Sequence, residues 1–180
     1  MEKSKEEYLI QRVRSFTNKG HIIERKDGPS IGHCIRNPLE FGFKLEIYES
    51  QELENLIYEI KMTNPLDEEY LFSVKEDGEL IGYLQKSEEN KLSPETWSVL
   101  DEDKELLCTV EERSVARSIL RDYVIGTLPI NYDIVSEETK KGLLRKKFSI
   151  YSSTYVLTLE KDLNLHEMML LSIPLCMENL

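Results

Sequence analysis

The sequence feature that most constrains the fold is a short apolar segment near the C-terminus. Between Glu167 and Glu178 stand ten consecutive residues without a charge. A membrane-spanning helix needs about 20 apolar residues, so this segment is too short to cross a bilayer. It is apolar on nearly every side when it is read as a helix, and such a helix is buried in a protein core. We expect Pro174 to kink the helix or to end it near Ile173.

Most of the chain before this segment is predicted to form short strands separated by turns. Between Phe41 and Leu159, apolar and polar residues alternate in short runs, which is typical of half-buried strands. The clearest element is a hairpin over 70–84, in which Asp77-Gly78 separates two apolar runs. This pair favours a type I′ turn, whose two central residues both need positive φ.

A short motif suggests that hairpins repeat along the chain. An aromatic residue, a serine and a β-branched residue begin at Phe72, at Trp97 and at Phe148, so the starts lie 25 and then 51 residues apart. Another strand-like stretch, 123–125, stands near the middle of the longer gap. Repeated hairpins of this kind are typical of a barrel or a propeller-like sheet.

Two segments depart from the strand pattern. Within Glu111–Asp122, Val115 and Ile119 are four residues apart, which predicts an amphipathic helix of about three turns or a helical turn between strands. Residues 50–56 are predicted to form a short capped helix.

The C-terminal part of the chain resembles a known superfamily. The stretches 144–151, 155–159 and 162–165, followed by the apolar helix, are similar to the end of the LURP-one-related proteins. These proteins are grouped with the phospholipid scramblases and with the C-terminal domain of tubby proteins. The hairpin over 72–82 is similar to the repeated hairpin unit of that superfamily. The resemblance covers about 43–177.

This resemblance implies a mainly β fold, a closed barrel of about twelve strands around a central hydrophobic helix. Residues 41–180 would form the barrel, with the core helix at about 164–177. Residues 1–40 are an unassigned segment that we expect to pack on the barrel or to be part of it. Pro174 departs from the family, whose central helix is uninterrupted. Scramblases carry a calcium-binding segment near that helix, and no comparably acidic stretch stands there in this chain.

Composition excludes some classes of partner. The net charge of -11 argues against nucleic-acid binding, which needs a basic surface. The three cysteines are far apart and form no CxxC pair, so we expect reduced thiols and no zinc or redox site. The N-terminal residues contain no apolar signal-peptide region, and we expect a cytoplasmic location.

No motif in the sequence predicts catalysis or metal binding. His33 and Cys34 would face opposite sides of a strand, and His166 is expected to cap or pack against the apolar helix. An acidic stretch from Asp101 follows calcium-loop spacing but has Leu106 where that loop requires glycine, so it predicts a hairpin turn. Glycine-rich phosphate loops are absent. We therefore expect a protein that is not an enzyme and uses no cofactor or metal.

Positive residues that could hold an anion fall into two clusters. The first cluster is a stripe at helical spacing and consists of Arg113, Arg117 and Arg121. The second cluster is a dense run further along the chain and consists of Lys140, Lys141, Arg145, Lys146 and Lys147. Arginine and lysine side chains gathered on one face bind phosphate groups. The alternative is a solvated face whose arginines pair with neighbouring acidic residues.

Two functional hypotheses follow. The first is a non-enzymatic domain that binds an anionic ligand, such as a phosphoinositide headgroup, through the two clusters. Tubby domains bind phosphoinositides, so the resemblance implies this function. The second is a cytoplasmic protein-interaction or regulatory domain with a filled barrel and no small ligand. A weaker third alternative is an enzyme whose site has no local motif.

Overall fold

The computed structural model describes residues 5–14, 19–36, 42–63, 70–87, 94–113, 130–148 and 153–180. These residues form twelve strands and the helix α2 (Glu167–Asn179). The strands are β1 (Lys5–Arg14), β2 (Lys19–Arg25), β3 (Ser30–Arg36), β4 (Lys44–Tyr48), β5 (Leu56–Met62), β6 (Tyr70–Glu76), β7 (Glu79–Ser87), β8 (Thr96–Leu100), β9 (Leu106–Glu112), β10 (Ile130–Ser136), β11 (Thr139–Phe148) and β12 (Ser153–Glu160).

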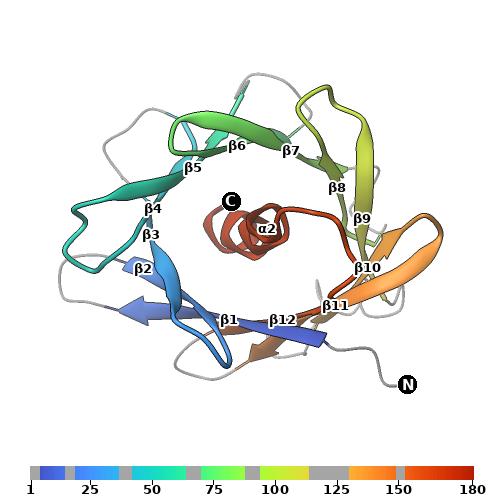
Figure 1. Ribbon diagram of the computed structural model, residues 1–180, viewed down its shortest axis with the longest axis horizontal. Helices are drawn as coiled ribbons and strands as arrows, with labels where there is room; N and C mark the ends of the chain where they lie inside the picture. Colours follow the sequence, from blue (N-terminus) through green and yellow to red (C-terminus); the bar gives the residue numbers. More distant parts are fainter. Residues whose placement is uncertain are drawn as a thin grey trace.

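Each strand pairs with its neighbours in the chain, and β1 pairs antiparallel with β12 to close the sheet into a barrel. The helix α2 lies inside this barrel, surrounded by the strands (Figure 1). The predicted fold class, a closed barrel of twelve strands around a C-terminal helix, is therefore confirmed. Residues 5–14, 19–25 and 30–36 form β1 to β3, so these parts of the unassigned N-terminal segment belong to the barrel wall.

The barrel has two distinct ends. One end of the barrel carries the connections β2–β3, β4–β5, β6–β7, β8–β9 and β10–β11 and the connection from β12 to α2. We call it the turn end. The opposite end, where α2 stops, is the far end. Consecutive strands are antiparallel, so the connections must alternate between these two ends.

The core is formed by inward side chains from every second strand position and by α2. On β4, for example, Leu45 and Ile47 are buried, while Lys44, Glu46 and Tyr48, which alternate with them, are half-exposed. Residues 168–176 of α2 are all buried, because strands surround the helix on all sides. Among the inward aromatic side chains, the ring of Phe72 lies 5.9 Å from that of Trp97. The uniformly apolar helix thus fills an interior that the strands alone would leave empty.

The prediction that the helix ends near Ile173 is wrong. The helix continues to Asn179 with Pro174 inside it. Proline removes one backbone donor, but the cost of about 3 kcal/mol is offset here because Leu175 and Cys176 beyond it are fully buried. Asn179 also donates its side-chain amide to the Leu175 carbonyl at 2.8 Å.

A β-bulge recurs at the turn end and gives the sequence repeat a physical basis. The pairing register shifts just before the turn in all five hairpins that meet there, after Ile23, Ile47, Val74, Val99 and Ile134. A bulge bends the strand and increases its twist, which helps a sheet to close. The motifs that begin at Phe72 and Trp97 each end on such a bulge residue.

The third copy of that motif differs from the other two. Phe148 ends β11, whose next connection lies at the far end, and residues 149–152 lie outside the described residues. The matching bulge segment is Tyr132-Asp133-Ile134 on β10, which lacks the serine and was therefore missed.

The two predicted helices have different outcomes. Residues 50–56 do not form a helix: a turn at 51–52 leads to Leu53, which has a φ of 59°, and β5 begins at Leu56. Glu111 and Glu112 belong to β9, which corrects the predicted helix start. The remainder of that prediction, from 114 to 122, lies outside the described residues, as does the strand-like stretch 123–125.

Candidate functional site

The predicted basic residues have several different surroundings. Arg117 and Arg121 lie outside the described residues. Arg113 and Lys140 come together on the outer wall at the carboxylate of Asp133, with N–O distances of 2.8 and 2.6 Å. Burial raises the pKa of Asp133, but the hydrogen bonds from these two cations outweigh it and hold the pKa below its usual value. One residue of each predicted cluster therefore meets the other at an acidic residue, which neutralises part of their charge.

The other residues of the second cluster point in different directions. Lys141 pairs with Asp162 at 3.3 Å. Lys146 points into the barrel, where its Nζ lies 2.7 Å from the Glu178 carboxylate, so it is not available to a ligand outside. Arg145 and Lys147 are exposed on the outer wall.

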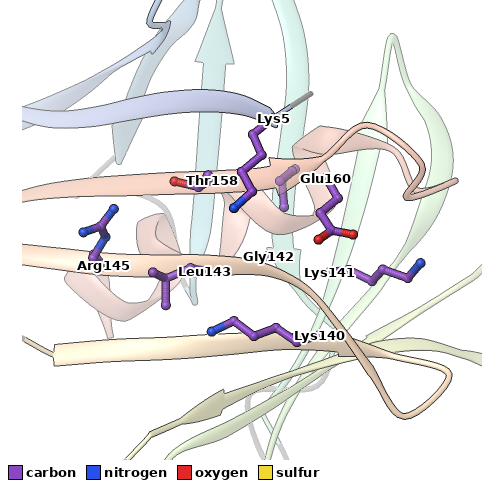
Figure 2. A pocket seen from close by; sticks show the side chains of 9 residues that line it. Lys5, Lys140, Lys141, Gly142, Leu143, Arg145, Thr158 and Glu160 are labelled. Atoms are coloured by element: carbon purple, nitrogen blue, oxygen red, sulfur yellow. The ribbon is translucent and has the colours of Figure 1, made fainter. Parts of the chain in front are cut away.

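A pocket of about 270 Å³ lies on the outer wall over β1, β11 and β12 (Figure 2). It is lined by Lys5, Lys140, Lys141, Gly142, Leu143, Arg145, Thr158, Leu159 and Glu160. Strand pairing sets this arrangement, because Leu143 lies opposite Thr158, and Lys5 lies opposite Glu160. Four of the lining residues are basic and one is acidic, in a protein whose net charge is -11.

The polar groups of this outer-wall pocket are only partly satisfied. Figure 2 shows the Lys5 and Lys140 side chains extending toward the wall around Leu143, whereas Lys141 points away. Among the residues that the structure describes, Lys5 and Arg145 form no ion pair, and the buried Thr158 hydroxyl has no hydrogen-bond partner. The wall thus presents positive charge to the pocket, whereas the Thr158 hydroxyl is shielded from solvent.

A network at the far end fastens the end of α2 to the barrel. The Glu178 carboxylate, whose side chain is 8% exposed, contacts Lys146 and accepts hydrogen bonds from Ser153 at 2.9 Å and Tyr155 at 3.0 Å. Arg12 lies 3.7 Å from the same carboxylate. Burial raises the pKa of Glu178, yet Lys146 and the hydroxyl donors lower it by more. This buried and well-paired carboxylate has a structural role.

The start of α2 is fastened at the turn end in a similar way. His166 accepts a hydrogen bond from the backbone of Met168 at 3.3 Å, so it caps the helix as predicted. Its other ring nitrogen lies 3.2 Å from Glu76. Arg25 contacts Glu167 at 2.8 Å, and the Tyr8 hydroxyl donates to the same carboxylate.

His21 is a buried polar residue beside the far-end network. It pairs with Arg12 across β1 and β2, is 7% exposed, and its Nε2 atom has no partner within the described part of the chain. Burial lowers the pKa of His21 to about 4; the carboxylate of Glu178 opposes this shift and Arg12 adds to it. The imidazole is therefore neutral at pH 7.

We expect the free energy of unfolding to fall as the pH drops from 6.5 toward 4. In that window the unfolded chain binds a proton at His21 and the folded chain does not, so lower pH favours unfolding. The full effect is about 3 kcal/mol. Urea unfolding at a series of pH values measures it, with His21→Leu as the non-titrating variant and His33→Gln as the control. Equal pH slopes for His21→Leu and the unchanged protein would contradict the assignment.

The remaining candidate residues of the sequence are accounted for by the fold. Cys34 is buried in the core, and burial raises the pKa of its thiol, while His33 faces the outer side of β3, as expected for adjacent strand residues. The Asp101 carboxylate accepts hydrogen bonds from the backbone of Asp103 and Glu105 within the β8–β9 turn. Across the described ranges, no cluster of three residues suited to a metal ion occurs.

In the part of the chain that the structure describes, no helix is long and apolar enough to cross a bilayer. The chain matches no protein-family model, and comparisons with curated proteins and with solved structures give no significant match.

Proposed function

We propose that this protein is a non-enzymatic, tubby-like binding domain that holds a phosphate-bearing ligand in the outer-wall pocket. The observation that carries the proposal is the lining of that pocket, where Lys5 and Arg145, which form no ion pair among the described residues, stand beside Lys140. Arginine offers a planar fork of donors to phosphate oxygens, and lysines add positive charge.

The size of the pocket and the charge of its surroundings define the ligand further. A volume of about 270 Å³ suits a phosphorylated headgroup or sugar better than a complete lipid. The net charge of -11 means that the rest of the molecule repels an anionic surface, so attraction depends on this local patch. The closed barrel around a helix is the architecture expected for the tubby-like superfamily. This agreement supports placing the protein in that superfamily, and it rests on architecture rather than on a sequence motif.

The ligand-binding residues differ from those expected from the sequence. Lys5 is added because β1 pairs with β12 and brings it beside β11. Lys146 is removed because it contacts Glu178 inside the barrel. We assign the strongest contributions to Lys5 and Arg145, whereas Lys140 must be shared with Asp133.

The double substitution Lys5→Ala with Arg145→Ala is expected to weaken binding of inositol phosphates about tenfold or more, since two charge-assisted contacts are lost. Isothermal titration calorimetry at low ionic strength measures this, where charge attraction is least screened. Liposome flotation with phosphoinositide vesicles, alongside phosphatidylserine vesicles, distinguishes a lipid headgroup from a free phosphate compound.

The matched control is Lys61→Ala with Lys75→Ala, which removes two charges from β5 and β6 at a distance from the pocket. This variant should bind as the unchanged protein does. If no phosphate compound binds at low ionic strength, or if both double variants bind equally well, the proposed site is wrong.

A further inference from the structure

A second and larger pocket lies at the turn end of the barrel. It has a volume of about 660 Å³ and is formed by the start of β9, the β10–β11 turn and the segment that leads into α2. Its lining includes an apolar group and a charged group of side chains. We call it the turn-end pocket.

The apolar side of the turn-end pocket includes two adjacent leucines that the fold leaves in solvent. Leu106 is 59% exposed and Leu107 is 36% exposed. Regular alternation would bury one of them, but the register shift between Val99 and Leu100 turns both outward. Leu163 and Leu165, from the segment before α2, are half-buried and line the same pocket. Apolar side chains gathered on the surface in this way mark interaction sites.

The charged side of the turn-end pocket is acidic. Glu137 and Glu138 line it and are both exposed. Their φ angles of 51° and 57° fix the β10–β11 turn, so these carboxylates project from a defined hairpin. Asp162 is also part of the lining and pairs with Lys141. The pocket therefore carries a net negative charge, opposite in sign to the outer-wall pocket.

The adjoining β8–β9 turn extends this negative surface. Glu102, Asp103 and Glu105 are exposed among the four residues that precede Leu106, and Lys104 is the one positive residue between them. An apolar pocket bordered by carboxylates complements a partner that offers apolar anchors flanked by positive charge. An anionic membrane surface would be repelled by the same carboxylates.

From this charge complementarity we propose that the turn-end pocket docks a basic amphipathic segment of another protein. Apolar side chains of that segment contact Leu106, Leu107 and Leu163, and its lysines or arginines pair with Glu137 and Glu138. The net charge of -11 accelerates the approach of such a partner. The two pockets share the lining residue Lys141, but the side chains assigned to the ligand and to the partner differ, so either proposal can fail without the other.

The probe is a synthetic helical peptide of about 14 leucine and lysine residues with its leucines on one face. Two reference peptides are a scrambled sequence of the same composition and a leucine–glutamate version. Fluorescence anisotropy at physiological ionic strength should show that the amphipathic basic peptide binds and that both reference peptides bind at least about tenfold more weakly.

Two variants of the protein test the pocket itself. Leu106→Ser with Leu107→Ser removes the apolar side without changing charge, and Glu137→Asn with Glu138→Gly removes two charges while keeping residues that suit a type I′ turn. Each should weaken the peptide about tenfold. The control Asp77→Asn with Glu79→Gln removes two charges at the β6–β7 turn of the same barrel end and should leave binding unchanged.

Four results would overturn the proposal. Equal binding of the scrambled peptide, or equal loss in the control variant, would show attraction to net charge alone. Equal binding of the leucine–glutamate peptide would remove the charge argument. Sedimentation that shows a dimer dissociated by Leu106→Ser with Leu107→Ser would assign the surface to a second copy of this chain. Unfolding curves of both pocket variants establish that each is folded.

Discussion

A chain that ends at His166, without α2, is expected to show no cooperative unfolding transition. Residues 168–176 are buried within the barrel, and six of them are large apolar side chains. At about 2 kcal/mol for each such side chain, the helix contributes roughly 12 kcal/mol, which is comparable to the whole stability of a typical domain. Without the helix, inward residues such as Phe72 and Trp97 would face water.

Urea unfolding followed by the fluorescence of Trp97 measures the effect, since Trp97 is the only tryptophan and is fully buried. A milder variant, Leu171→Ala, should remain folded and lose about 2–5 kcal/mol. The control is removal of Leu180 alone, which is 50% exposed and should change stability by less than about 0.5 kcal/mol. A shortened chain that unfolds as cooperatively as the full chain would show that the barrel does not depend on its helix.

Two local patterns predicted the buried helix and one hairpin of the fold, whereas the closed barrel of about twelve strands was expected from the resemblance to a known superfamily. The uncharged segment 168–177 predicted a buried helix, and strands on all sides are what an all-round apolar helix requires. Asp77-Gly78 predicted the β6–β7 turn, where both residues have positive φ, as expected. The effect of Pro174 was not predictable, because it depends on how strongly residues beyond the proline are buried by distant strands.

The candidate site was less predictable, because it depends on pairing between distant strands. The sequence identified the cluster 140–147, but alternation along β11 places Lys146 inside the barrel and Arg145 outside. Lys5 could not be found from local sequence, since only the β1–β12 pairing brings it to the pocket. The exposure of both Leu106 and Leu107 likewise depends on a bulge that no short motif in β9 indicates.

Gly82→Ala is expected to destabilise the protein by about 4 kcal/mol, the sum of backbone strain and overpacking. Gly82 has a φ of 145°, which L side chains rarely adopt. A Cβ there would stand 2.4 Å from the Leu100 carbonyl oxygen and 2.8 Å from the Cε of Met169 on α2. The methionine can move, but Leu100 is held by its pairing with Tyr83, so the backbone contact decides the cost.

Gly78→Ala, in the turn of the same hairpin, separates the two contributions. Gly78 has a φ of 87°, but nothing lies within 4 Å of the position that its Cβ would take. This variant therefore carries the conformational strain without the clash and should cost about 1 kcal/mol. Urea unfolding of both variants gives the comparison. Similar losses of stability in the two variants would mean that β7 does not need the close approach to β8 and α2 that a glycine permits. A clearly larger loss for Gly82→Ala would show that closure of the barrel at the β6–β7 bulge depends on the packing of α2.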